Sequence, residues 1–334
     1  MAKSVFMVLL CAGPLSADSD SITPKIVQLP YVQDFAWDAT RSRLFASAGS
    51  SIIMIDPETA QVEDTIATGV SAGRIAVSDD GQYLYAAVGS RGIVQRYRLQ
   101  THAVELEIPL GTDRQGHNLC AAAMVALPGQ PQSILIARGS WLGDNYLFSI
   151  ASQDVAVYND AVPRKGTLSL DVRSFYIQGG RGATLSRRIS LDGLRAPRPI
   201  RRSVDPVFGW VPGHAYQFTV SADGVALGRS FLVPVSFSKD SLPTWNGSLL
   251  SDRAGTVVDV GTGVPLGRAA MGASGCALAP DWTGDTVLAA QADASRFNPP
   301  AHLVQYSLDS FRASGTVSVA PTQDFLGACD FASM

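Results

Sequence analysis

The chain has 334 residues, of which 46% are hydrophobic and 16% are charged. This composition is too apolar for an intrinsically disordered chain and is typical of a globular protein with a large core. The formal net charge of −3 provides no excess of positive charge for phosphate contacts, so a nucleic-acid partner is not expected.

The N-terminal segment has the pattern of a secretory signal peptide. Lys3 precedes the apolar run 5–12 (VFMVLLCA), and a segment that ends in the small residues Ser16 and Ala17 follows. The run is too short to cross a bilayer, which takes about 20 apolar residues, and no later segment is long enough. We therefore expect residues 1–17 to be removed on export to the periplasm or the extracellular space, and we expect no transmembrane segment. A buried strand over residues 4–10 is the alternative.

Two successive segments repeat with a shift of 40 residues. Residues 35–48 (FAWDATRSRLFASA) and 75–88 (IAVSDDGQYLYAAV) both consist of an apolar run, a polar turn and a second apolar run. Each continues into a second pair of strand-like runs, over 51–69 and 92–111, so each unit is expected to contain four short strands. A period of about 20 to 50 residues indicates a repeat architecture.

Later copies of the unit are less regular. Residues 124–137 and 276–290 repeat the first hairpin, and residues 302–319 repeat the second. The predicted units start near residues 34, 74, 124, 166, 205, 240 and 276. Small sheets of this kind bury both faces by packing side by side around an axis. The sequence therefore predicts an all-β fold, a β-propeller of about seven four-stranded blades with a range of six to eight, in one domain over residues 22–334.

Residues 51–69 (SIIMIDPETAQVEDTIATG) and 74–88 (RIAVSDDGQYLYAAV) resemble the bacterial Tyr-Val-Thr-Asn repeats. These repeats belong to secreted or periplasmic propellers that are related in shape to lactonase propellers and Trp-Asp repeat proteins. The resemblance is good over 34–111 and fair over 121–159 and 242–310. It implies a propeller fold and an exported protein, but no catalytic residue.

Motifs of metal binding are not found in the sequence. There is no Cys-x-x-Cys, and the four histidines are scattered. Aspartate in a turn ordinarily accepts hydrogen bonds from the nearby backbone. That role is expected for the aspartates of the predicted turns, Asp56, Asp79, Asp80, Asp223, Asp281 and Asp309. No cofactor is expected, and the three cysteines beyond residue 17 cannot form a complete set of disulfides.

The residues directly before the predicted inner strands form the candidate binding site, because they should ring one mouth of the central channel. These residues are Asp34, Arg74, Met124, Cys276 and Asp330. The site rests on analogy with other propellers, which often bind ligands at this mouth. For Asp34 and Arg74 the alternative is an ion pair that joins adjacent blades and binds no ligand.

Two classes of function remain open. The first is an exported binding or scaffold module with an unknown protein or small-molecule ligand. The second is a metal-dependent, lactonase-like hydrolase with its site at the channel mouth. The hydrolase requires at least three carboxylate, amide or imidazole ligands to converge at that mouth.

The two ends of the sequence predict an incomplete closing blade. Residues 25–29 precede the first unit as an outer strand would, and residues 330–332 align with the inner-strand residues 34–36. Propellers commonly join strands from both termini in one sheet, which removes free edges. Only the outermost and innermost strands would be present here, so we expect the closing blade to lack its two middle strands.

Overall fold

The computed structural model describes about three fifths of the chain. The described residues are 5–9, 21–22, 25–29, 32–127, 129–141, 150–164, 214–221, 223–232, 244–245, 249–251, 255–259, 262, 264–269, 275–280, 286–292 and 301–319. Within these ranges the chain forms strands and turns, with one turn of 3-10 helix at Gly89–Arg91. None of the described segments is a helix long and apolar enough to cross a membrane.

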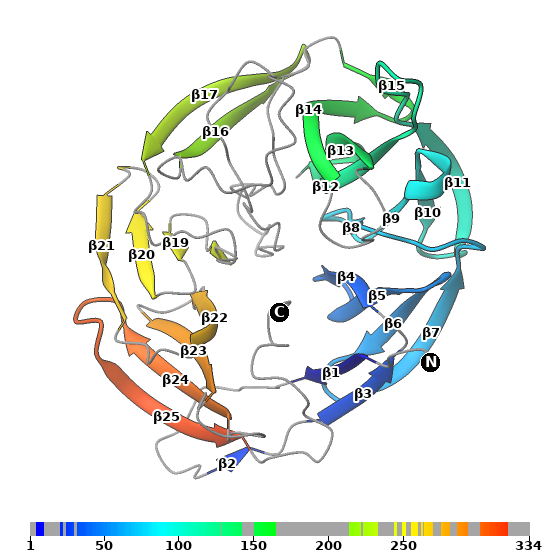
Figure 1. Ribbon diagram of the computed structural model, residues 1–334. Helices are drawn as coiled ribbons and strands as arrows, with labels where there is room; N and C mark the ends of the chain where they lie inside the picture. The colour runs from blue at the N-terminus through cyan, green and yellow to red at the C-terminus, as the bar shows by residue number, and fades with distance from the viewer. Residues whose placement is uncertain are drawn as a thin grey trace.

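The strands form small sheets that are set around a central axis (Figure 1). The first three antiparallel four-stranded sheets are called blades 1, 2 and 3, and their strands follow one another from the axis outward. Blade 1 contains β4 (Val32–Asp38), β5 (Arg43–Ala48), β6 (Ser51–Asp56) and β7 (Gln61–Ala67). Blade 2 contains β8 (Ile75–Val77), β9 (Tyr83–Val88), β10 (Ile93–Arg98) and β11 (Ala103–Pro109). Blade 3 contains β12 (Leu119–Leu127), β13 (Gln130–Trp141), β14 (Ile150–Asn159) and β15 (Val162–Pro163).

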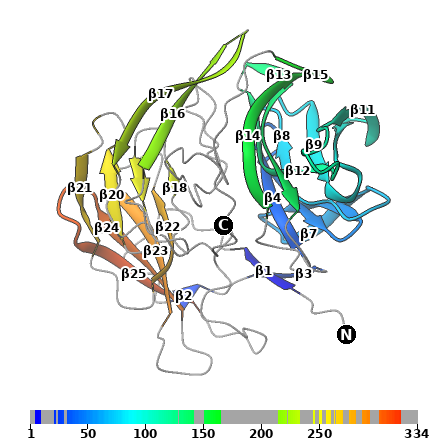
Figure 2. The ribbon, with the colours of Figure 1, turned by 45° about the horizontal axis from the view of Figure 1, so that its top comes forward.

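The second half of the ring lies across the axis from blades 1 to 3 (Figure 2). It begins with the pair β16 (His214–Ser221) and β17 (Gly224–Leu232), and β17 lies beside β14 of blade 3. The next sheet contains β18 (Thr244–Trp245), β19 (Leu249–Ser251), β20 (Thr256–Asp259) and β21 (Val264–Arg268). The last contains β22 (Gly275–Pro280), β23 (Thr286–Ala292), β24 (Ala301–Ser307) and β25 (Ala313–Val319).

The predicted units agree with several of these sheets. Innermost strands begin at Val32, Ile75, Thr244 and Gly275, within a few residues of the predicted starts. The third unit is an exception, because β12 begins at Leu119 and not near residue 124. The predicted starts at 166 and 205 lie outside the described residues. The described sheets do not form a closed ring, so the number of blades stays a prediction.

The apolar core lies between neighbouring blades. Successive residues of a strand point to opposite faces of its sheet, so each blade contributes to two apolar layers. Leu84 of β9 packs with Phe45 and Ile52 in the layer between blades 1 and 2. The next residue, Tyr85, packs with Ile134 in the layer between blades 2 and 3.

The outer hairpins share one turn conformation that the sequence does not reveal. Ala60, His102 and Phe311 have positive φ values of 60°, 56° and 54°. Each backbone N–H donates a hydrogen bond of 2.8 Å to the carbonyl four residues earlier. The strand after each turn contains a β-bulge, which changes the direction of the strand locally. The structural repeat is therefore more regular than the sequence repeat.

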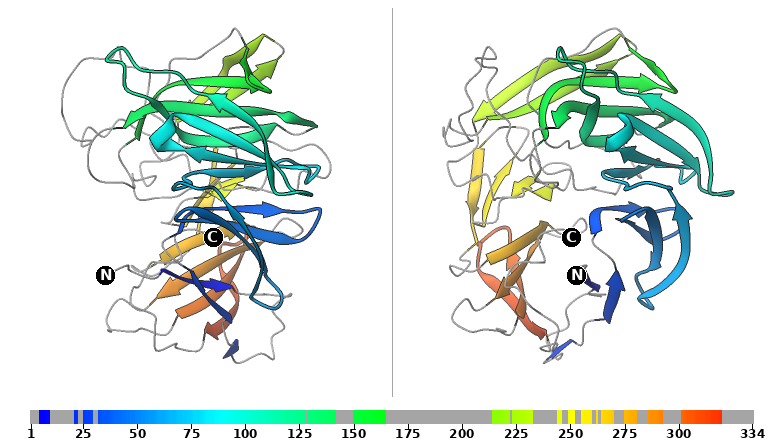
Figure 3. Two further views of the ribbon diagram at one scale, coloured as in Figure 1. Left: turned by 90° about the vertical axis from the view of Figure 1, so that its right-hand side faces the viewer. Right: turned by 45° about the vertical axis from the view of Figure 1, so that its right-hand side comes forward.

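The N-terminal strands lie between blade 1 and the β22–β25 sheet (Figures 1 and 3). β1 (Val5–Leu9) pairs antiparallel with β3 (Lys25–Leu29). β2 (Ser21–Ile22) joins β25 in parallel as a fifth strand of the last sheet. Among the described residues the partner of β3 is thus β1. Residues 330–332, the expected innermost strand of the closing blade, lie outside the described residues. The strand over Val5–Leu9 matches the alternative to the signal peptide, and removal of residues 1–17 stays a prediction.

Candidate functional site

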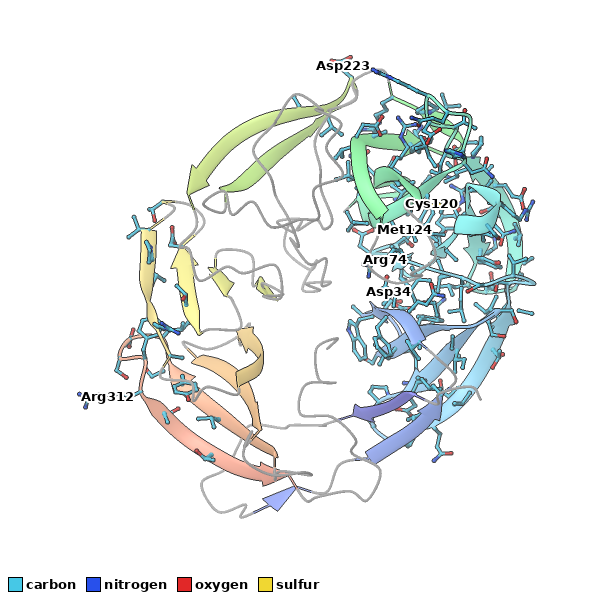
Figure 4. The ribbon with its side chains drawn as sticks, in the orientation of Figure 1. Asp34, Arg74, Cys120, Met124, Asp223 and Arg312 are labelled. Atoms are coloured by element: carbon cyan, nitrogen blue, oxygen red, sulfur yellow. The ribbon has the colours of Figure 1, made fainter. Side chains whose placement is uncertain are left out.

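The starts of the inner strands of blades 1 and 2 meet at one end of the ring, which we call the mouth (Figure 4). Asp34 is the third residue of β4, and Arg74 directly precedes β8. Asp34 Oδ2 accepts a hydrogen bond of 3.0 Å from the backbone N–H of Ile75. Arg74 Nη1 lies 3.6 Å from Asp34 Oδ1. An ion pair thus joins the two adjacent blades, as the alternative requires, and its other half, that the pair binds no ligand, stays a prediction.

Arg74 extends this contact to a third blade. Its Nε donates a hydrogen bond of 3.1 Å to the carbonyl of Ala122 in β12. The side chain of Arg74 is nevertheless 42% exposed, and that of Asp34 is 21% exposed. Beside them, Gln33 Nε2 donates a hydrogen bond of 3.0 Å to Ser71 Oγ. The mouth of blades 1 to 3 therefore carries polar groups that are fixed in place and still reach solvent.

Polar links also join the blades at the opposite end. Asp38 is fully buried and accepts hydrogen bonds from the backbone N–H of Thr40 at 2.9 Å and from Arg41 Nη1 at 2.7 Å. Arg41 also donates to the carbonyl of Gly81, in the first hairpin turn of blade 2. These contacts hold the turn of blade 1 against the turn of blade 2.

The turn aspartates have two different roles. Asp56 accepts from the backbone N–H of Glu58 at 2.8 Å, and this bond lowers the pKa of Asp56. Asp80 accepts from the N–H of Gln82 at 2.9 Å, so the expected turn role of these two is confirmed. Asp79 instead accepts a hydrogen bond of 2.6 Å from Gly129 in blade 3. Asp281 lies outside the described residues.

A buried arginine joins blades 2 and 3. The side chain of Arg96 in β10 is 6% exposed, and its Nη1 lies 2.6 Å from Asp160 Oδ1 of blade 3. Its Nε lies 3.3 Å from Glu105 Oε2, and its guanidinium carbon lies 4.6 Å from the centre of the Tyr83 ring. Nearby, the Tyr85 hydroxyl donates a hydrogen bond of 2.7 Å to the carbonyl of Pro131. Burial raises the pKa of Tyr85 to about 12.

A second arginine is held within blade 3 and reaches blade 2. Arg138 Nε and Nη2 donate to the two carboxylate oxygens of Asp154 at 2.8 Å and 2.6 Å. Its Nη1 donates to the Tyr158 hydroxyl at 2.8 Å and to the carbonyl of Leu110 at 3.2 Å. Sequence analysis missed both arginine clusters, because their partners are distant in sequence. The available signal was the positive charge of Arg96 and Arg138 within strand-like segments.

Met124 does not belong to the site of Asp34 and Arg74. Met124 lies in the middle of β12, is 3% exposed and belongs to the apolar layer between blades 2 and 3. Its predicted place before the inner strand is wrong, because β12 starts five residues earlier. Cys276 is the second residue of β22, in the last sheet. Asp330 lies outside the described residues.

Cys120 is the second residue of β12 and lies at the end of the strand that is nearer the mouth. Its thiol donates a hydrogen bond of 3.4 Å to the carbonyl of Gly89, and burial raises the pKa of the thiol. Both observations fit a small buried residue of apolar character.

The described part of the mouth shows no cluster of carboxylate, imidazole or thiol groups. No group of three or more His, Cys, Asp or Glu side chains in the described residues could hold a metal ion. Asp34, the carboxylate of the mouth, lies beside the positive charge of Arg74, which disfavours binding of a cation.

The protein resembles solved structures that cover nearly all of its length. It matches "Dihydro-heme d1 dehydrogenase NirN in complex with DHE" with a TM-score of 0.52 and 13% identity, over 95% of this chain and 64% of that one. It also matches the WD40 repeats of RRP9, with a TM-score of 0.49 and 13% identity over 94% and 84% of the two chains. No protein-family model and no curated protein matches the sequence. The chain thus spans less than two thirds of NirN, and the likeness shows a β-propeller-like repeat fold alone.

Proposed function

We propose that the protein is an exported binding or scaffold module that holds a protein or small-molecule ligand at the mouth of blades 1 to 3. The observation that carries this proposal is the chain of contacts from Asp34 through Arg74 to Ala122, which spans three blades and leaves Arg74 42% exposed. A binding group that is held in place loses little freedom when a ligand arrives. The propeller-like fold and the N-terminal sequence pattern also support an exported binding module.

The charge chemistry of the mouth suits a ligand with hydrogen-bond acceptors. A guanidinium has five N–H donors in a planar fork. The contacts to Ala122 and Asp34 use Nε and Nη1 of Arg74 and fix the plane of the fork. A ligand that offers a carboxylate or a carbonyl could then meet the exposed part of the guanidinium without reordering the side chain.

Blade 3 makes the mouth asymmetric. β12 has nine residues where β8 has three, and β13 has twelve where β9 has six. Arg138 pairs with Ala121, and Ser140 pairs with Leu119, so the extension lies at the mouth end. The three residues 139–141 add about 10 Å of height at the usual rise of a strand. A ligand at the mouth would therefore contact Arg74 and, on one side, the extended strands β12 and β13 of blade 3.

The test compares two double variants of equal charge. Asp34→Ala with Arg74→Ala removes the pair at the mouth, and Asp223→Ala with Arg312→Ala removes an exposed acid and an exposed base from the periphery (Figure 4). Each is expressed with the natural N-terminus, and proteins that co-purify with the exported chain are quantified by mass spectrometry, together with small molecules that it retains. We expect a retained species to be lost with the mouth pair and kept with the peripheral pair. Equal retention by both variants would contradict the proposal, provided that both keep their thermal unfolding midpoints.

A further inference from the structure

We propose that residues 112–118, which we call the mouth hairpin, form with Arg74 one surface that binds an acidic, extended segment of a partner protein. The proposal rests on the proposed function, because it assigns a class of partner to the same mouth. It adds a second contact to Arg74 and gives the connection between blades 2 and 3 a role in binding.

The connection between blades 2 and 3 is longer than the one between blades 1 and 2 and has a structure of its own. Seven residues, 68–74, lead from β7 to β8, and nine residues, 110–118, lead from β11 to β12. In the longer connection Thr112 pairs with Asn118 as an antiparallel bridge. The chain thus forms a small hairpin where it passes from the outer strand of blade 2 to the inner strand of blade 3.

The carboxylate of Asp113 holds the mouth hairpin in one conformation. The side chain of Asp113 is 3% exposed. Its Oδ1 accepts hydrogen bonds from the backbone N–H groups of Gln115 at 2.8 Å and His117 at 2.9 Å. Its Oδ2 lies 3.2 Å from Nδ1 of His117, so the imidazole is held through one of its two nitrogens. The tip of the hairpin is therefore ordered before a partner arrives and loses little freedom on contact.

The base of the mouth hairpin is fixed to blades 2 and 3. The N–H of Leu110 donates a hydrogen bond of 2.9 Å to the carbonyl of Gly92, in the turn between β9 and β10. The N–H of Leu119, the first residue of β12, donates one of 2.9 Å to the carbonyl of Gly111. A Cβ atom at Gly92 would lie 2.8 Å from Cβ of Asn118, which shows how closely the two residues pack. The hairpin therefore has a fixed place beside the mouth end of β12.

Arg74 lies further along the same strand. β12 contains a β-bulge between Ala121 and Ala123, and the carbonyl of Ala122 within it accepts the hydrogen bond from Arg74 Nε. Residues 119–121, about 10 Å of strand, separate this carbonyl from the hairpin. A single carboxylate can therefore contact Arg74 or the hairpin, whereas an extended segment of about six residues spans both.

The groups that this surface exposes attract carboxylates. Arg114, at the tip of the hairpin, is exposed, and no ion pair joins it to a carboxylate of the described residues. The side chains of His117 and Arg74 are 71% and 42% exposed. Their carboxylate partners, Asp113 and Asp34, are only 3% and 21% exposed, so the acids that would repel an acidic segment are turned inward. The other charges at this end form ion pairs with each other, Arg91 with Glu107 and Arg138 with Asp154.

Binding of glutamate peptides to the purified full chain tests the proposal. Hexaglutamate is long enough to reach from Arg74 to the hairpin, and diglutamate is not. One variant combines Arg114→Ala with His117→Ala at the tip, and a second carries Arg74→Ala. Arg312→Ala is the control, because it removes an exposed arginine from the periphery (Figure 4). Calorimetric titration at low salt gives the dissociation constants, and thermal unfolding midpoints report that each variant is folded.

We expect hexaglutamate to bind the unsubstituted protein about tenfold or more tightly than diglutamate, because one chain then engages both contacts. The tip variant and Arg74→Ala should each bring the two affinities within about threefold of each other, and Arg312→Ala should keep the difference. Absence of hexaglutamate binding, equal binding of the two peptides, or a tip variant that keeps the preference would overturn the proposal. Tighter binding of a hexathymidine oligonucleotide would overturn it too, since the partner would then be a nucleic acid.

The co-purification experiment with the paired variants at Asp34 and Arg74 measures ligand binding at the mouth separately. A retained species that is lost with those variants, together with no preference for hexaglutamate, would contradict the acidic partner and leave the proposed function in place. Failure of either idea can thus be told from failure of the other.

Discussion

Blades 1 and 2 meet at His102, and blades 2 and 3 meet at Asp160, and both residues have the left-handed conformation in an outer hairpin turn. His102 Nδ1 lies 3.3 Å from Asp64 Oδ2 of blade 1, with 31% and 43% of the two side chains exposed. Asp160 lies 2.6 Å from the buried guanidinium of Arg96 of blade 2. The repeat thus decides where neighbouring blades touch, while burial decides how much each contact contributes to stability.

The β24–β25 hairpin extends this comparison. Phe311 has the same left-handed conformation, with φ of 54°, and it packs against Gly267 of β21. Gly267 is the fourth residue of β21, as Asp64 is the fourth residue of β7. The same position thus carries an ion pair between blades 1 and 2 and an aromatic ring on a glycine between the last two sheets.

The largest effect is expected at the contact between blades 2 and 3. Asp160→Ala should lower the free energy of unfolding by about 2 kcal/mol, because it leaves Arg96 buried with Glu105 alone; a fully buried pair would cost more. Arg96→Met combined with Asp160→Ala should recover part of this loss. Urea unfolding of the unsubstituted protein and of these two variants measures the changes in the free energy of unfolding. A loss below about 0.5 kcal/mol for Asp160→Ala would show that the contact is equivalent to an exposed ion pair.

The next effect is steric. A Cβ atom at Gly267 would lie 2.2 Å from Phe311 Cε2, so Gly267→Ala should cost about 1.5 kcal/mol by overpacking. Phe311→Ala in the same chain removes the clash. The double variant should therefore lose less stability than the sum of the losses in the two single variants. A double-mutant cycle by thermal unfolding decides this. Simple additivity would mean that the ring does not rest on Gly267.

Alkaline pH should weaken the contact between blades 2 and 3 through Tyr85. Burial raises the pKa of Tyr85 to about 12, so the folded state retains a proton that the unfolded chain releases near pH 10. Stability from this group is complete below about pH 10 and is lost as the pH rises towards 12. Tyr85→Phe should lower stability by about 1 kcal/mol at pH 8, where it loses the bond to Pro131, and should reduce the decline above pH 10. Unfolding curves at pH 8, 10 and 11 measure both effects, and an unchanged decline in Tyr85→Phe would contradict the assignment.

The smallest effect is expected between blades 1 and 2. Asp64→Asn removes the charge from a half-exposed pair with His102 and should change the free energy of unfolding by about 0.5 kcal/mol or less. Chemical denaturation at low and high salt measures this change, with Asp160→Asn as the matched change at the contact with the buried Arg96. A larger loss for Asp64→Asn than for Asp160→Asn would reverse the ranking of the two contacts.

The fold was predictable where polar turns separate the apolar runs. Blades 1 and 2 have such turns at residues 39–42 and 79–82, and their strands lie where the repeat predicts them. In β12 all nine residues are buried, so the sequence has no alternation that sets the start of the strand, and Met124 was misplaced for that reason. The outer turns were hidden as well, because Ala60, His102 and Phe311 hold a conformation that usually signals glycine.

The candidate site was predictable only in part. Asp34 and Arg74 could be found because they occupy equal positions in two clear repeats, 40 residues apart. The hydrogen bond from Arg74 to Ala122 joins a side chain to a backbone carbonyl 48 residues away, and no residue type marks that partner. The pair of Arg96 and Asp160, 64 residues apart, is hidden for the same reason.

Site-specific photo-crosslinking of the exported protein tests the binding role of the mouth most directly. A photoreactive residue replaces Ser71, which is exposed beside Asp34 and Arg74, or Val62, which is 48% exposed on the outer strand of blade 1. Irradiation of cells that export each variant, followed by mass spectrometry, identifies what each position contacts. We predict one reproducible cross-linked species from position 71 and its absence from position 62. A specific species from position 62, with none from position 71, would contradict the proposal that the mouth is the binding surface.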